Sequence, residues 1–164
     1  MIKHEPMDKA VRDSWADIVE DDFYPLGKGF LSARIDGVFR YCPLGLLCEL
    51  GVSEGVIPDP NIRSAGLLWT PGGPDEDTAG DLLFKEYDGE TGILPRRIMN
   101  WGKLNQRTPT VNPSARQRRN WLLPPRYRHH GGVNPPWVPL HYISDRLIID
   151  RRELGDLIRA LPAR

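Results

Sequence analysis

The sequence predicts an α+β fold, in which a small antiparallel hairpin or sheet is packed by three to five helices. Two observations predict this class. Asp-Gly at 36–37 separates two β-leaning runs, which favours a hairpin because a type I′ turn needs positive φ at both central residues. Apolar residues recur at helical spacing near both ends of the chain. The 164 residues, 40% of them apolar, suit a single domain over 1–164.

The first half predicts a helix, a hairpin and a second helix. The helix covers 8–20, where Val11 and Trp15 share one face. Strands at 30–35 and 38–41 form the hairpin. The second helix starts at Pro43, which suits a first turn, and we expect Gly51 to cap its end. This helix carries Leu44, Leu47 and Cys48 on one face, so we expect it to be central and buried.

The second half contains weaker signals. Runs at 67–69 and 82–84 are candidate paired strands, joined by a Pro-, Gly- and Asp-rich loop. Residues 93–95 open a predicted short helix, in which Leu94, Ile98 and Trp101 are spaced to face inward. Residues 112–138 are predicted to be an extended basic insertion with little regular structure. Helices follow at 139–144 and 150–161, the latter with Asp150 and Glu153 as a capping box.

Charge is segregated along the chain although the formal net charge is zero. Residues 1–90 hold 8 Lys and Arg against 18 Asp and Glu, a net of −10. Residues 91–144, called the basic segment below, hold 9 Lys and Arg and no acid, a net of +9. Residues 145–164 hold 5 basic and 4 acidic residues, which closes the sum to zero. A split of this kind concerns partners or internal docking more than fold.

The densest part of the basic segment combines arginines with aromatic residues. Guanidinium groups match phosphate geometry, and aromatic rings offer stacking surfaces to exposed bases. We therefore predict partner contacts, with nucleic acid or an acidic protein surface, from Arg116, Arg118, Arg119, Trp121, Arg126, Tyr127 and Arg128. The alternative is that this arm docks on the chain's own acidic half or is a solvated loop, since exposed ion pairs contribute only about 0–1 kcal/mol each.

The cysteines support neither a disulfide nor a zinc site. Cys42 and Cys48 are six residues apart, and on a helix they are about 9 Å apart in rise, too far for a disulfide. Zinc sites use closer pairs of ligands, so His129 and His130 do not complete one. Cys42, ahead of a predicted helix and near Arg40, is a candidate nucleophile, although buried packing is the favoured interpretation. No metal or cofactor is predicted.

The chain resembles a family of small uncharacterised phage and prophage proteins of actinobacteria. Residues 40–50 are similar to that family's Phe/Tyr-Cys-x-Leu-Gly-x-Leu-Cys core, which Trp15 precedes. Residues 92–95 and 101–104 resemble its Leu-Pro and Trp-Gly-x-Leu segments. Two departures stand out: Pro43 replaces the second residue of the family's Cys-Cys pair, and residues 114–137 look like an insertion. The resemblance implies a phage context and no established activity.

Together these features predict a phage- or prophage-derived accessory protein that binds a polyanionic partner through the basic arm, without catalysis of its own. Two alternatives stay open: a virion or assembly component, in which the acidic half of one copy docks on the basic arm of the next, and an enzyme that uses Cys42. No apolar stretch is long enough to cross a bilayer, and acids stand where a signal peptide needs an apolar run. We therefore expect a cytoplasmic protein of a bacterial host, or a virion protein, with no membrane partner.

Overall fold

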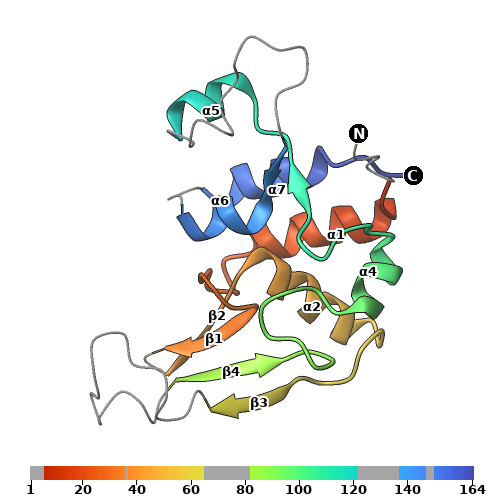
Figure 1. The fold of residues 1–164 in the computed structure, drawn as a ribbon, viewed down its shortest axis with the longest axis vertical. Coiled ribbons are helices and arrows are strands. Elements are labelled where there is room, and N and C mark those ends of the chain that lie inside the picture. Colours follow the sequence, from red (N-terminus) through yellow and green to blue (C-terminus); the bar gives the residue numbers. More distant parts are fainter. Residues whose placement is uncertain (1–5, 36, 65–81, 122–136, 147–149) are drawn as a thin grey trace.

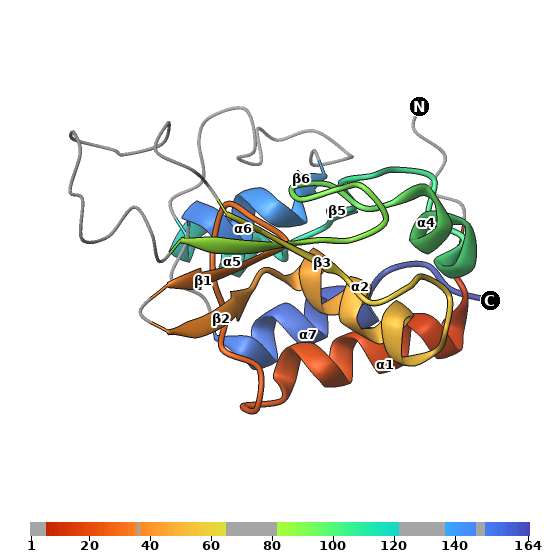
Figure 2. The same cartoon turned by 90° about the horizontal axis from the view of Figure 1, so that it is seen from below.

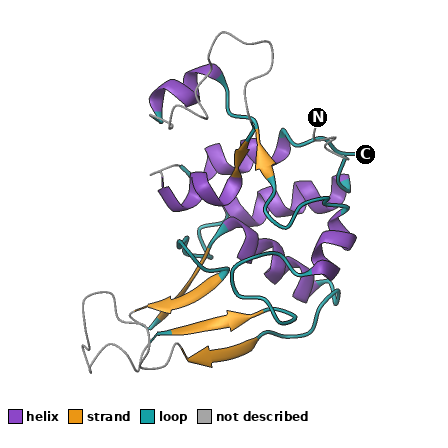
Figure 3. Ribbon diagram, viewed as in Figure 1, coloured by secondary structure: helices purple, strands orange, loops and turns teal. Residues whose placement is uncertain are grey.

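The computed structural model describes residues 6–35, 37–64, 82–121, 137–146 and 150–164, and it confirms the α+β class (Figure 1). A four-stranded sheet forms one end of the molecule and most helices lie together beyond it (Figure 3). The described residues contain six helices, one more than the upper limit predicted. They are α1 (Lys9–Glu20), α2 (Pro43–Ser53), α4 (Arg96–Gly102), α5 (Ala115–Asn120), α6 (Leu140–Arg146) and α7 (Arg151–Arg159).

The main sheet has the strand order β2-β1-β4-β3 and is antiparallel throughout. Its strands are β1 (Ser32–Ile35), β2 (Val38–Tyr41), β3 (Asn61–Ser64) and β4 (Leu83–Glu86). The predicted hairpin is confirmed: β1 and β2 pair directly, and Gly37 has a φ of +78°. The predicted strand at 82–84 corresponds to β4, whereas 67–69 lies outside the described residues. The partner of β4 at the edge is β3, which the sequence analysis missed.

Helix α2 is central and buried, as predicted, and it contacts α1, α4, α6 and β2 (Figure 2). It begins after Cys42, whose Sγ accepts a hydrogen bond from the backbone N of Gly45 at 3.4 Å. The backbone at Gly45 lies against the residue before β1: an added Cβ would come 1.7 Å from the carbonyl oxygen of Leu31. Only glycine fits there, so α2 can approach the sheet closely.

The predicted end of α2 is wrong. The helix continues through Gly51 to Ser53, and Glu54 caps it. Gly51 is needed for packing instead, because an added Cβ there would lie 2.1 Å from Cδ1 of Ile98 on α4. The left-handed residue that follows the helix is Gly55, with a φ of +72°. Leu94 and Ile98 are fully buried and Trp101 is half-buried, as the spacing of the α4 region predicts.

Helices α1 and α7 lie side by side in opposite directions, since Arg12 contacts Leu161 whereas Val19 contacts Arg151. Both start where the sequence predicts, with Asp8 and Asp150 as N-caps. Trp15 of α1 is fully buried, and its Nε1 donates to the carbonyl oxygen of Pro43 at 2.7 Å. Both helices thus pack into the same cluster of buried side chains as α2.

The predicted insertion 112–138 contains regular structure that the sequence analysis did not expect. Two short strands, β5 (Thr110–Val111) and β6 (Val138–Pro139), pair antiparallel and bring its two ends together. Helix α5 starts at a capping box: Ser114 Oγ accepts from the N of Gln117, and Gln117 Oε1 accepts from the N of Ser114. The prediction of little regular structure is therefore wrong for 115–120, and 122–136 lies outside the described residues.

Candidate functional site

The basic segment exposes cations on two of its elements. Arg96 on α4 and Arg116 on α5 are exposed, and neither makes a hydrogen bond or ion pair with the described part of the chain. Three further cations contact carboxylates of the acidic half: Arg97 with Asp88 at 3.6 Å, Lys103 with Asp8 at 3.8 Å and Arg107 with Glu90 at 2.8 Å. All three basic side chains remain 42–64% exposed, so these contacts hold them only weakly.

Arg118, predicted as a partner contact, lies inside the molecule. The residue is 3% exposed, and burial lowers the pKa of its guanidinium. Its Nε donates to the carbonyl oxygen of Pro113 at 2.9 Å, and its Nη2 donates to Oδ1 of Asn112 at 2.8 Å. These bonds tie α5 back to the turn that precedes it. We therefore remove Arg118 from the predicted contact set and assign it a structural role.

The other residues of the predicted contact set divide into two groups. Trp121 is half-buried and packs against the hydrophobic core, so its ring is only partly open to a partner. Arg119 belongs to α5, but its side chain is not described. Arg126, Tyr127 and Arg128 lie outside the described residues. Among the members of the predicted set whose side chains the structure describes, Arg116 is the one at the surface with its charge available.

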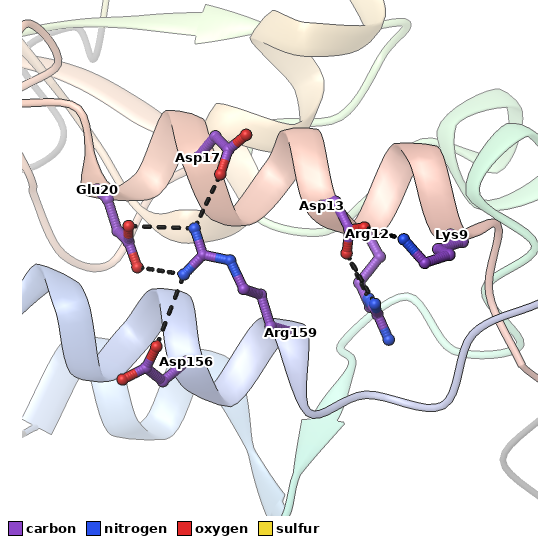
Figure 4. A network of polar contacts seen from close by, with 7 residues as sticks. All are labelled: Lys9, Arg12, Asp13, Asp17, Glu20, Asp156 and Arg159. Atoms are coloured by element: carbon purple, nitrogen blue, oxygen red, sulfur yellow. Dashed lines mark hydrogen bonds and ion pairs between the residues drawn. The ribbon is translucent and has the colours of Figure 1, made fainter.

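In the described ranges, most carboxylates of residues 1–90 that form ion pairs do so with cations from outside the basic segment. Arg159 of α7 binds Glu20 through two nitrogens, at 2.5 and 3.1 Å, and Asp17 at 2.8 Å (Figure 4). Arg151, also on α7, donates to the carbonyl oxygens that end α1, at Val19 and Asp21. These arginines come from 145–164, so the α1–α7 seam is neutralised without the basic segment.

A second polar cluster lies between the sheet and α2. Lys85 Nζ is 2.7 Å from Oε1 of Glu49 and 2.9 Å from Oη of Tyr41. It also lies 5.1 Å and 4.9 Å from the ring centres of Phe39 and Tyr41, within cation–π range. Tyr87, fully buried, donates its Oη to the same Glu49 oxygen at 2.5 Å.

The chemistry of this cluster is structural. Burial alone would lower the pKa of Lys85, but the hydrogen bonds to Glu49 and Tyr41 outweigh burial and raise this pKa. Burial and the neighbouring Glu49 also raise the pKa of Tyr87 far above its ordinary value. Both groups hold their protons at neutral pH, so neither is poised as a base. This cluster was not predicted from the sequence. Lys85 and Tyr87 are two positions apart, a spacing that places strand residues on the same face of a sheet.

Cys42 is poorly placed for nucleophilic chemistry. It is 5% exposed, and its sulfur already accepts the capping hydrogen bond of α2. Cys48 is fully buried, and desolvation raises the pKa of its thiol well above the ordinary value. The cysteines form no disulfide, as predicted. Reactive cysteines lie in partly exposed surroundings that a substrate can reach, whereas packing shields the sulfur of Cys42.

The described ranges contain neither a candidate metal site nor a membrane-spanning helix. No group of three or more His, Cys, Asp or Glu side chains in them is arranged to hold a metal ion. None of the helices in the same ranges has the length and apolar content needed to cross a membrane. Comparison of the chain with models of known protein families, with curated proteins and with solved structures found no match. The resemblance to the phage family therefore stays a prediction.

Proposed function

We propose that this chain is a binding protein without a reaction of its own, and that its basic segment takes up a polyanionic partner, with nucleic acid as the first candidate. The observation that supports this proposal is how the charges pair. Arg159 and Arg151 bind carboxylates of the α1–α7 seam. Arg63 binds Glu86 of the sheet, and Lys85 binds Glu49 of α2. All four cations come from outside the basic segment. Within the described residues, the basic segment gives the acidic half only the exposed contacts to Asp8, Asp88 and Glu90, and Arg96 and Arg116 stay available to a partner.

The physical reasoning is that a run of cations without any carboxylate creates a local positive potential at the surface. Arg96 and Arg116 offer guanidinium groups directly, and Arg97 and Lys103 can leave their long, exposed contacts at little cost. Phosphates that replace these contacts release counterions, which adds to affinity. The resemblance to phage proteins would make the chain an accessory protein of a phage or prophage.

The alternatives have less support. Self-assembly through acidic-to-basic docking would have to use the exposed carboxylates that remain, such as Asp22 and Glu54, because Glu20 and Asp17 are already bound by Arg159. An enzyme that uses Cys42 needs a reachable sulfur, yet this residue is 5% exposed. An acidic protein surface could bind the same cations through its carboxylates. It differs from nucleic acid because it has no bases to stack on aromatic rings and no regularly spaced phosphates.

A titration of labelled duplex and single-stranded nucleic acid at several salt concentrations tests the proposal. We expect log K to fall linearly with log salt, by about 0.9 per phosphate contact for duplex and about 0.7 for single strands. Arg116→Ala and Arg96→Ala should each reduce the slope of log K against log salt by the value of about one phosphate contact. This holds for each residue whose helix touches the phosphate backbone of the nucleic acid. Arg152→Ala, an equally exposed arginine on α7, is the matched control and should leave the slope unchanged.

The result that would overturn the nucleic-acid proposal is an absence of binding at low salt. Equal slopes for Arg116→Ala, Arg96→Ala and Arg152→Ala would place any binding outside the described basic segment. If nucleic acid fails, the same variants can be titrated with an acidic polypeptide such as polyglutamate. Binding there, lost with Arg116→Ala but not with Arg152→Ala, would favour an acidic protein surface.

A further inference from the structure

A surface pocket of about 260 Å³ is lined by residues of α1, α2 and α4 and of their ends. These three helices lie together, away from α5 (Figures 1 and 2). Val11 of α1 and Leu50 of α2 form part of its wall, and Trp101 of α4 forms another part. Two carboxylates, Asp8 and Glu54, complete it from the start of α1 and the end of α2. The pocket thus combines apolar walls with negative charge, and no lysine or arginine is among its lining residues.

The two carboxylates have capacity left for a ligand. Asp8 caps α1 with Oδ1, which accepts from the backbone N of Val11 at 3.1 Å. Its Oδ2 lies 3.8 Å from Nζ of Lys103, a side chain that is 57% exposed and so loosely held. The carboxylate of Glu54 is exposed and has no ion pair or side-chain hydrogen bond within the described ranges. Glu54 caps α2 through its backbone N–H alone, so its side chain is not needed for the helix.

Trp101 gives the pocket an aromatic wall fixed in place. Its ring packs beside Gly51 of α2, where an added Cβ would lie 3.7 Å from Cζ3. This distance is close to van der Waals contact, so the ring lies directly against α2. Tryptophan is the side chain whose face attracts cations most strongly. A tryptophan ring and two carboxylates beside an apolar wall favour a ligand that is both cationic and partly apolar.

We propose that this pocket binds a small organic cation, an ammonium or guanidinium group on a short apolar stem. Asp8 and Glu54 neutralise the head, and Val11, Leu50 and Trp101 cover the stem. The volume lies just below the range of about 300–1,000 Å³ typical for drug-sized ligands, which suits a molecule of amino-acid size. This site shares Lys103 with the polyanion proposal, since Lys103 pairs with Asp8, but the two proposals can be tested apart because their ligands have opposite charge.

Lys103 competes with the ligand for the carboxylate of Asp8. Its ammonium lies near Asp8 at the edge of the pocket, so an incoming cation must displace it or share the carboxylate. Lys103 has a left-handed backbone with a φ of +54°, which asparagine also tolerates. Lys103→Asn therefore removes the ammonium without straining the chain, and affinity for the cation should rise.

The test is a titration of the full chain with butylguanidinium, followed by NMR of the tryptophan indole signals, with butylurea as the neutral analogue of the same shape. We expect saturable binding of the cation and none of butylurea over the same range. Asp8→Asn/Glu54→Gln should weaken binding at least tenfold, and asparagine still caps α1. Asp59→Asn, an exposed carboxylate outside the pocket, should leave affinity unchanged. Trp101→Leu should weaken binding roughly three- to thirtyfold, the range expected for a lost cation–π contact.

Equal affinity in the wild-type chain and in Asp8→Asn/Glu54→Gln would overturn the proposal, as would equal binding of butylurea. Circular dichroism of each variant ensures that a loss of binding is not a loss of folding. A blocked pentapeptide with one central arginine is titrated in parallel. Tighter binding of the peptide would assign the cation to a partner's side chain, whereas tighter binding of butylguanidinium would assign it to a free ligand. Nucleic-acid binding by Asp8→Asn/Glu54→Gln is measured separately, so that either proposal can fail alone.

Discussion

Two charge networks of this protein use the same kinds of side chain in different surroundings. Under the sheet, Lys85 and Glu49 are 15% and 18% exposed, and two tyrosine hydroxyls complete their hydrogen bonds. Along the α1–α7 seam, Arg159 is 36% exposed and one of its partners, Asp17, is 74% exposed. Water and salt reach the seam but hardly reach the cluster. The comparison teaches that the distance between two charges does not by itself set how much an ion pair stabilises the fold. The loss of free energy of unfolding when one partner is removed depends on how far the other is shielded from water.

The largest effect is expected from breaking the cluster under the sheet. Lys85→Met should lower the free energy of unfolding by about 2–3 kcal/mol, because the Glu49 carboxylate is left half-buried without its cation. Urea denaturation followed by circular dichroism measures this change. Glu49→Gln and the double variant complete a thermodynamic cycle. A loss below about 0.5 kcal/mol, typical of exposed pairs, would show that the cluster and the seam do not differ.

The second expected effect is alkaline destabilisation. The folded-state pKa of Tyr87 is raised, so its contribution to stability is full below the ordinary tyrosine pKa of about 10 and is lost as pH rises beyond it. This group alone should remove about 1.4 kcal/mol from the free energy of unfolding between pH 9 and pH 11. The pKa of Lys85 is also raised, so Lys85 acts in the same direction.

Tyr87→Phe is the control for this pH dependence. At pH 8 it should cost about 1 kcal/mol, because the hydrogen bond to Glu49 is lost. Its unfolding free energy should then fall less steeply above pH 10 than that of the wild-type chain. Parallel curves for the two proteins in urea titrations at pH 8 to 11 would contradict the assignment to Tyr87.

The smallest effect is expected at the seam. Arg159→Ala should lower the free energy of unfolding by about 0.5–1 kcal/mol at low salt, and by less at high salt, because the pairs with Asp17 and Glu20 are screened. Arg152→Ala, exposed on the same helix, should cost nothing measurable. Thermal melts at two salt concentrations compare the variants. A salt-independent loss above 2 kcal/mol would mean that the seam behaves like the buried cluster.

Local signals in the sequence predicted most of the fold. Helices α1, α2, α4, α6 and α7 and the β1–β2 hairpin follow from apolar spacing and from Pro43, Asp150 and the Asp-Gly pair. Strand β3 was missed because Asn61–Ser64 is an exposed edge strand without apolar alternation. The end of α2 was misplaced because a glycine looks the same in sequence whether it caps a helix or makes room for Ile98.

The candidate site was less accessible to sequence reasoning. A stretch of arginines does not indicate which guanidinium group turns inward, and Arg118 did so because Pro113 and Asn112 offer acceptors nearby. The Ser114 to Gln117 capping signal was present and would have predicted α5. The pocket beside Trp101 depends on three helices meeting, which no local pattern encodes. Only long-range packing brings Asp8 and Glu54 into one site.

The pairing of α1 with α7 has a consequence for biosynthesis. The bond between Val19 and Arg151 spans 132 residues, so the earliest helix leaves the ribosome long before its neighbour is translated. At elongation speeds of about 5–20 residues per second, this wait lasts roughly 7 to 26 seconds. During that interval the apolar stripe around Trp15 lacks its final cover, and nascent chains are then most exposed to aggregation and to capture by chaperones.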